Sequence, residues 1–148
     1  MAALTAAREA LAALPATLLV KASSLYRTAP VGYSDQPDFL NAVCWFKTGL
    51  GPWAFAEAVF ALERDLGRVR TGVRNGPRVI DIDLLYFGGA CEPGPILQLP
   101  HPRFHERAFV LYPWREIMPD FGVPGVGRIA DLCAAVQDQR TERLEMRW

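Results

Sequence analysis

Apolar residues recur along the chain at helical intervals in four places. Leu4, Leu11 and Leu14 predict an N-terminal helix that ends before Pro15. Three more helices are predicted, over residues 52–66, 104–117 and 129–136. The first of these three begins with a proline and carries an apolar face of phenylalanine, valine and leucine. Pro113 should end or kink the second, because proline lacks the backbone N–H that a helix uses.

Other stretches have the composition of strands. Five strands are predicted, over residues 18–28, 39–48, 79–87, 96–100 and 143–148. The third is apolar on both faces except for two aspartates, which is typical of a buried strand. Strands and helices in this order predict an α+β fold, with helices packed on a mixed or antiparallel sheet. No linker or repeat interrupts the 148 residues, so we expect a single domain over residues 1–148.

Composition narrows the range of functions. Sixteen Lys and Arg balance sixteen Asp and Glu, which argues against a protein that binds nucleic acid by neutralising its phosphates. No apolar run reaches the ~18 residues of a membrane span. Three widely spaced cysteines without a metal-binding pattern favour a reducing compartment, so we expect a cytoplasmic protein without disulfide bonds or zinc.

Asp81 and Asp83 are the strongest chemical signal. Two residues apart on a strand, their side chains leave the same face, about 6.6 Å apart at the backbone. Two carboxylates on an apolar strand repel each other and lose hydration unless a cation lies between them. Magnesium suits such a pair, since it takes hard oxygen ligands and completes its shell with water and phosphate. A salt-bridge network with nearby arginines is the alternative.

An arginine-rich loop stands directly before these aspartates. Residues 67–78 read GRVRTGVRNGPR, with four arginines and three glycines. Guanidinium groups bind phosphate oxygens in pairs, and glycines allow a loop to close over a ligand and reopen. A solvated basic loop is the alternative, but the position favours binding of ATP or a similar polyphosphate.

Four further residues carry weaker signals. His101 follows a proline, and a lone histidine is more often structural than functional. Asn41 stands among apolar neighbours, where its amide could satisfy the backbone or contact the edge of a flat heterocycle. Phe39 and Phe109 would be core residues on composition alone.

Four sequence blocks together resemble the 6-hydroxymethyl-7,8-dihydropterin pyrophosphokinase family: SSLYRTAPVGYSDQPDFLNAV, ERDLGRVR, NGPRVIDIDLLYFGG and LPHPRFHERAFVLYPWREI. They cover about residues 18–121. The combination R-x-I/L-D-I/L-D with a downstream P-H, five residues and R-x-F is highly specific to this family. The resemblance implies a ferredoxin-like α/β sandwich. It also implies transfer of the β,γ-pyrophosphoryl group of ATP to the hydroxymethyl oxygen of the pterin, with release of AMP, in folate biosynthesis.

The resemblance also implies the roles of individual residues. Two Mg²⁺ ions would be held by Asp81 and Asp83, and ATP would be the co-substrate. The catalytic set would comprise Arg68, Arg70, Arg78, Asp81 and Asp83. Contacts to ATP would come from Glu63, Arg70, Arg78, His101 and Arg107. The pterin would lie between Phe39 and Phe109, with further contacts from Thr28, Pro30, Val31 and Asn41. We expect a monomer whose partners are these small molecules only, with neither nucleic acid nor membrane.

The chain departs from the family pattern at several points. Asn75 stands where many members have tryptophan, Ala29 replaces a proline, and Pro102 stands where an aromatic residue often follows the histidine. The chain also begins inside the helix that follows the family's first strand and its G-S-N-type loop. We therefore expect a sheet without that strand, with low stability and weak activity, or a natural protein that starts upstream.

Two other functions remain open at this point. A non-catalytic relative could bind pterin or nucleotide without turnover, although it would have no need of metal-binding carboxylates. A magnesium-dependent nucleotidyltransferase for another substrate would explain the aspartates and arginines. It would not explain Phe39, Asn41 and Phe109.

Overall fold

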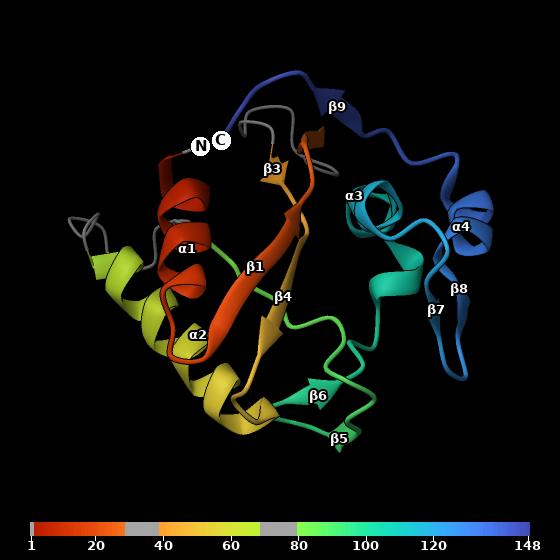
Figure 1. Ribbon diagram of the computed structural model, residues 1–148. Coiled ribbons are helices and arrows are strands. Elements are labelled where there is room, and N and C mark those ends of the chain that lie inside the picture. Colours follow the sequence, from red (N-terminus) through yellow and green to blue (C-terminus); the bar gives the residue numbers. More distant parts are fainter. Residues whose placement is uncertain (1, 29–38, 69–79) are drawn as a thin grey trace. The chain divides into compact units, whose positions relative to one another are not determined.

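The computed structural model describes residues 2–28, 39–68 and 80–148, and within them four α-helices (Figure 1). The helices are α1 (Ala2–Ala12), α2 (Pro52–Arg68), α3 (Ala108–Ile117) and α4 (Ile129–Leu132). Two 3-10 turns, η1 (Phe104–Glu106) and η2 (Cys133–Val136), precede α3 and follow α4. All four predicted helices are therefore present in part or whole. The one predicted over 104–117 is interrupted by the extended backbone of Arg107, and the one over 129–136 is α-helical only to Leu132. Pro113 does not end α3, which continues to Ile117.

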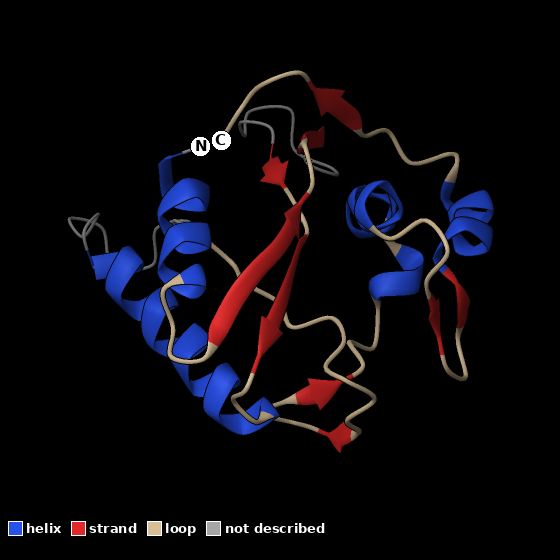
Figure 2. Cartoon of the chain, in the orientation of Figure 1, coloured by secondary structure: helices blue, strands red, loops and turns tan. Residues whose placement is uncertain are grey.

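Strands occur as short antiparallel pieces between and after these helices (Figure 2). They are β1 (Thr17–Ala22), β2 (Leu25–Thr28), β3 (Phe39–Asn41), β4 (Cys44–Thr48), β5 (Glu92–Pro93), β6 (Gln98–Leu99), β7 (Gly122–Val123), β8 (Gly127–Arg128) and β9 (Glu142–Leu144). In the described residues β2 is the centre of a three-stranded sheet of order β3-β2-β9, and the pairs β1-β4, β5-β6 and β7-β8 are separate. The predicted α+β class is confirmed. The expectation of a missing first strand stays a prediction.

The first two predicted strands are each divided in two. Ser23 lies at the break after β1, where its hydroxyl accepts the backbone N–H of Val43 at 2.9 Å and donates to the carbonyl of Ser24 at 2.8 Å. The Ser23 N–H also donates to the Val43 carbonyl at 2.9 Å. A side chain that bonds the backbone in this way competes with a regular ladder. The Ser23 hydroxyl therefore bonds backbone groups at the point where the strand predicted over residues 18–28 is interrupted.

The predicted strand over residues 79–87 is wrong for its described part. Residues 80–87 pair with no strand among the described residues. Apolar composition does not by itself supply a backbone partner, and here the partners are isolated groups. The Ile82 N–H donates to a side chain, Glu63 Oε2, at 3.0 Å, and the Leu85 carbonyl accepts the N–H of His101 at 2.9 Å.

A glycine turn ends this segment. The Ala90 N–H donates to the Phe87 carbonyl at 2.7 Å, and the two residues between them, Gly88 and Gly89, have φ of 51° and 82°. Positive φ at both central positions of a turn strongly favours glycine. The turn reverses the chain toward β5.

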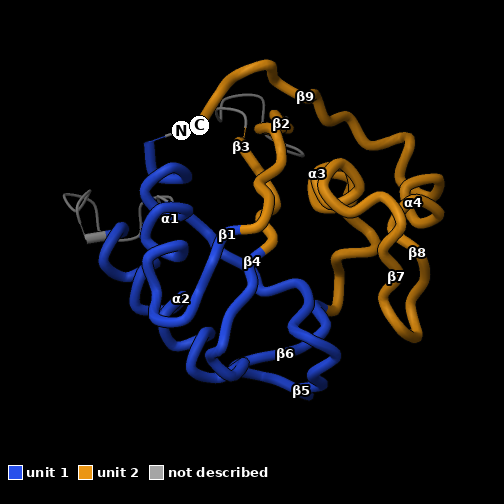
Figure 3. The backbone as a smooth tube through the Cα atoms, in the orientation of Figure 1, with its two compact units in different colours: residues 1–19, 46–101 blue, residues 20–45, 102–148 orange. Residues whose placement is uncertain are grey.

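By contacts the chain divides into two compact units, shown in Figure 3. Unit 1 comprises residues 1–19 and 46–101, and unit 2 comprises residues 20–45 and 102–148. In unit 1, α1 and α2 pack side by side. Leu11, Phe55 and Val59 form the centre of its core, against which Ile82 and Leu84 of the segment 80–87 pack. The single domain predicted over residues 1–148 stays a prediction.

The core of unit 2 is built around α3. Six of the ten residues of this helix are buried: Ala108, Val110, Leu111, Pro113, Trp114 and Ile117. Trp114 lies between Phe104 and Phe121, with ring centroids 5.2 and 5.8 Å away. Helix α3 also packs against β2. Full burial of side chains of this size contributes about 1.5–3 kcal/mol each, so α3 is the main anchor of its unit.

Candidate functional site

Asp81 and Asp83 lie on the solvent side of the segment 80–87. Both residues are exposed, whereas Ile82 and Leu84 between and after them pack into the core of unit 1. This alternation is that of an extended chain with one buried face, although the segment forms no ladder with another described strand. The sequence prediction that the two carboxylates share a face is confirmed. Their burial in a strand, which the same pattern predicted, is wrong.

Glu63 of α2 holds the segment at the residue between the two aspartates. Its Oε2 accepts the backbone N–H of Ile82 at 3.0 Å. A hydrogen bond to a carboxylate is stronger than one to a neutral acceptor. Because Ile82 is also anchored in the core, this bond fixes the backbone from which both carboxylates project.

His101 lies beside the second aspartate. Its Nε2 is 3.9 Å from Asp83 Oδ2, and its side chain is 16% exposed against 52% for Asp83. The backbone of His101 is tied to the segment 80–87 through the bond to Leu85. The structure therefore brings together Glu63, Asp83 and His101 in unit 1, as well as Asp81.

Two of the predicted arginines lie outside the described residues. Arg68 is the last residue of α2, and Arg70 and Arg78 lie outside the described ranges. The same holds for Asn75 and for most of the glycine-containing loop that was expected to close over a nucleotide. Their roles stay predictions.

The candidate pterin residues belong to unit 2. Thr28 ends β2, and Phe39 and Asn41 are the first and last residues of β3. The register pairs Thr28 with Phe39 and Tyr26 with Asn41. Residues directly opposite in an antiparallel pair share a face, as do residues two apart on one strand. All four side chains therefore leave one face of the sheet.

One of the two phenylalanines that composition alone would assign to the core is exposed. Phe39 is 54% exposed, so it is not a core residue. Phe109, near the start of α3, is half-buried. The guanidinium carbon of Arg107 lies 5.6 Å from the centroid of the Phe109 ring, within the range of a cation–π contact. Pro102 is exposed, while Ala29, Pro30 and Val31 lie outside the described residues.

The donor set suits a hard divalent cation. Asp81 and Asp83 offer carboxylate oxygens on an exposed face, and magnesium usually takes one or two carboxylates and completes its shell with water and phosphate. Within the described ranges no three residues of the types His, Cys, Asp and Glu cluster as a metal site. The two aspartates thus fit an ion that a phosphate substrate would help to hold.

Sequence reasoning missed one polar cluster in unit 2. Glu116 on α3 accepts three hydrogen bonds, two from Ser24 and one from Tyr26. Burial and the bond to this carboxylate raise the pKa of Tyr26 above its ordinary value. The only signals in the sequence are two serines and a tyrosine in an early strand and a glutamate in an apolar helix, which nothing local connects.

Two kinds of comparison place the chain among known proteins. A model of the family described as 7,8-dihydro-6-hydroxymethylpterin-pyrophosphokinase (HPPK) matches residues 1–119. A Pseudomonas aeruginosa protein named 2-amino-4-hydroxy-6-hydroxymethyldihydropteridine pyrophosphokinase is 42% identical, over 94% of this chain and 85% of its own length. The chain belongs to the HPPK family. The resemblance found in the four sequence blocks is confirmed, and the α+β fold is consistent with this family.

Further relatives of the chain agree with membership of the HPPK family. A Methylorubrum extorquens protein with the same name is 44% identical, over 96% of this chain and 89% of its own length. A folic acid synthesis protein of Dictyostelium discoideum is 42% identical over 67% of this chain, a match that covers 15% of that longer protein. These names support a pyrophosphokinase of folate biosynthesis and do not favour a non-catalytic relative.

No helix in the described ranges has the length and apolar composition that crossing a membrane requires.

Proposed function

We propose that the chain transfers the β,γ-pyrophosphoryl group of ATP to 6-hydroxymethyl-7,8-dihydropterin. The hydroxymethyl oxygen forms a bond to the β-phosphorus, and the bond from that phosphorus to the oxygen bridging the α- and β-phosphates breaks. AMP leaves with the electron pair of the broken bond, and the hydroxyl proton is released. The observation that carries this proposal is membership of the HPPK family combined with the exposed carboxylates of Asp81 and Asp83.

Asp81 and Asp83 would hold two Mg²⁺ ions. Bound magnesium supplies neutralisation of phosphate charge and a lower pKa for the attacking hydroxyl. The exposed positions of the two carboxylates support this role, because ligands for a substrate-bound ion must be open to the substrate. Glu63 supports it through its bond to Ile82, which orients the backbone of both aspartates.

The arginines would neutralise and orient the polyphosphate, and other polar residues would contact the rest of ATP. Phosphoryl-type transfer depends on positioning and charge stabilisation more than on covalent help. We assign this work to Arg68, Arg70 and Arg78 as catalytic residues, and contacts to ATP to Glu63, Arg70, Arg78, His101 and Arg107. His101 is supported by its place beside Asp83. No residue is assigned as a general base.

The pterin would be recognised by two aromatic rings and a polar edge. Phe39 and Phe109 would stack on the flat ring, and Asn41 would bond its edge, with Thr28, Pro30 and Val31 completing the contacts. The common sheet face of Thr28, Phe39 and Asn41 supports this assignment. An amide that pairs with the pterin edge discriminates against a ring that would leave it unpaired.

One assay tests the proposal. The chain is incubated with ATP, Mg²⁺ and 6-hydroxymethyl-7,8-dihydropterin, and AMP is measured against reactions that lack the pterin or contain EDTA. We expect AMP release that needs both pterin and magnesium. Release of AMP regardless of pterin would point to another acceptor, and pterin binding without AMP would point to a binding protein; either result overturns the proposal.

We also propose a cytoplasmic monomer. ATP is a cytoplasmic co-substrate, and the proposed contacts all come from one chain. Sedimentation of the purified chain at several concentrations checks the monomer, and cell fractionation checks the location.

A further inference from the structure

The carboxylate of Glu116 joins α3 to the start of β2. Its Oε2 accepts the backbone N–H of Ser24 at 2.9 Å and the Ser24 hydroxyl at 3.0 Å, and its Oε1 accepts the Tyr26 hydroxyl at 2.7 Å. Both oxygens are therefore bonded to β2 and the residue directly before it. Hydrogen bonds to an ionised acceptor are about twice as strong as neutral ones, so this contact is more than a surface pairing.

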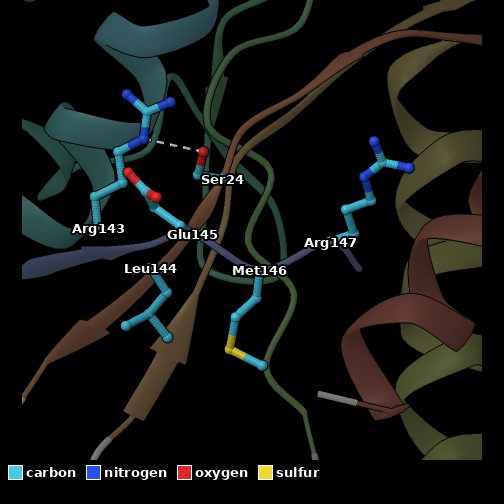
Figure 4. A pocket seen from close by; sticks show the side chains of 6 residues that line it. All are labelled: Ser24, Arg143, Leu144, Glu145, Met146 and Arg147. Atoms are coloured by element: carbon cyan, nitrogen blue, oxygen red, sulfur yellow. Dashed lines mark hydrogen bonds between the residues drawn. The ribbon is translucent and has the colours of Figure 1, made fainter.

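The cluster is shielded from water on most sides. Tyr26 is 6% exposed and the Glu116 side chain 21%. Arg143 of β9 borders it: the Arg143 Nε donates to the Ser24 hydroxyl at 3.1 Å, and a terminal guanidinium nitrogen lies 3.7 Å from Glu116 Oε2. Figure 4 shows the Arg143 side chain bonded to Ser24. Both residues line a cavity of about 250 Å³. Arg143 is thus the solvent-side member of the cluster.

The sheet register places this cluster on the proposed pterin face. Tyr26 stands opposite Asn41, and Thr28 opposite Phe39. Their side chains share one face of β2 and β3, and it is this face that Tyr26 directs toward α3 by its bond to Glu116. The anchored tyrosine and the candidate recognition residues are therefore on the same side of the sheet.

The helix carries the matching pair of residues. Phe109 and Glu116 are seven positions apart on α3, which is close to two helical turns, so they lie on the same side of the helix. Phe109, the proposed stacking residue, is near the start of this side of α3. Glu116, whose carboxylate bonds Tyr26 of β2, is near its end. A shift of α3 along or away from the sheet changes both positions together.

We propose that Glu116 is a positioning residue for the pterin site: by fixing α3 against β2, it sets the separation between Phe109 and the recognition residues Phe39 and Asn41. The inference rests on the proposed function, since it names the pterin as the ring held between these elements. Glu116 itself does not touch the substrate. Its effect is on the gap into which a planar ring must fit.

Three variants of the full chain test the inference. Glu116→Ala removes both acceptors. Tyr26→Phe removes only the tyrosine hydroxyl and leaves Ser24 bonded. Ile129→Val, a cavity-forming change at a fully buried site of the same unit, lowers stability and leaves every hydrogen bond of Glu116 in place, so it serves as the matched control. KM for pterin, KM for ATP, kcat and the melting temperature are measured for each, well below the melting temperature.

We expect Glu116→Ala to raise the KM for pterin about tenfold and Tyr26→Phe about threefold, with the KM for ATP unchanged within twofold. Ile129→Val should lower the melting temperature and leave both KM values unchanged. Unchanged pterin KM in both cluster variants, or equal rises in Ile129→Val, would overturn the inference. If Glu116→Ala fails to fold, Tyr26→Phe decides alone. Absence of pterin-dependent AMP release in the unaltered chain would instead refute the proposed function.

Discussion

The two units carry their candidate functional groups in opposite ways. In unit 1 the carboxylates of Asp81 and Asp83 are exposed on a segment without strand pairing among the described residues. In unit 2 the candidate residues of β2 and β3 stand on a three-stranded ladder that Glu116 ties to α3. Carboxylates that bind an ion with substrate phosphates must be open, while a pocket for a flat ring needs fixed walls. Unit 1 thus offers open carboxylates and unit 2 an anchored sheet face, as their proposed ligands would require.

The largest effect expected from this contrast is at the open carboxylates. Asp83→Asn keeps the size of the side chain and removes its charge, so AMP release should fall about 100-fold or more. The fold should be unchanged, because substitutions at exposed sites usually alter stability by less than about 0.5 kcal/mol. Glu57→Gln, another exposed acidic residue of unit 1, is the control. Near-normal AMP release by Asp83→Asn would refute the metal assignment.

The second prediction asks whether Glu63 of unit 1 acts through its hydrogen bond or through its negative charge. Glu63 is expected to act through its bond to the Ile82 N–H, and a glutamine can still accept that bond. Glu63→Gln should therefore retain most activity, whereas Glu63→Ala should lose about tenfold, as expected for a lost hydrogen bond of about 1–1.5 kcal/mol. Steady-state AMP release measures both. An equal loss in the two variants would show instead that the negative charge is what matters.

A third, smaller effect concerns the ring walls of unit 2. Phe39→Leu keeps an apolar side chain and removes the aromatic face, so the KM for pterin should rise about three- to tenfold, given about 0.5–1.5 kcal/mol for an aromatic pair. The KM for ATP should stay unchanged. Trp53→Leu, at an exposed aromatic position of unit 1 (42% exposed against 54% for Phe39), should alter neither KM. A matching rise in the KM for ATP would contradict the division of roles between the units.

The smallest effect is on stability at alkaline pH. The pKa of Tyr26 is raised in the folded chain from its ordinary value of 10.0, so above about pH 10 the unfolded chain loses this proton before the folded chain does. Folding stability from this group is complete below pH 10 and is lost as the pH rises further. Tyr26→Phe should therefore weaken the alkaline decline of the melting temperature between pH 9 and 11. Tyr112→Phe is the control, and an unchanged decline in Tyr26→Phe would argue against the shift.

The sequence by itself determined the helices, the common face of Asp81 and Asp83, and the family. These depend on local signals: apolar periodicity, the two-residue repeat of an extended chain, and short motifs in fixed order. It could not determine that residues 80–87 would be exposed on one side and would pair with no strand among the described residues, because burial and backbone partners come from distant parts of the chain. Glu63, which bonds Ile82, stands in another element.

Only the tertiary structure decided which groups of unit 2 meet. Ser24 and Glu116 are 92 positions apart, and no local pattern links a serine between two strands to a carboxylate in an apolar helix. Their contact follows from how β2 and α3 pack, which is set by the summed burial of residues such as Leu25 and Leu111. A hydrophobic pattern states which face is buried. Which hydrogen-bond partner a polar group meets on that face depends on how the other helices and strands pack against it.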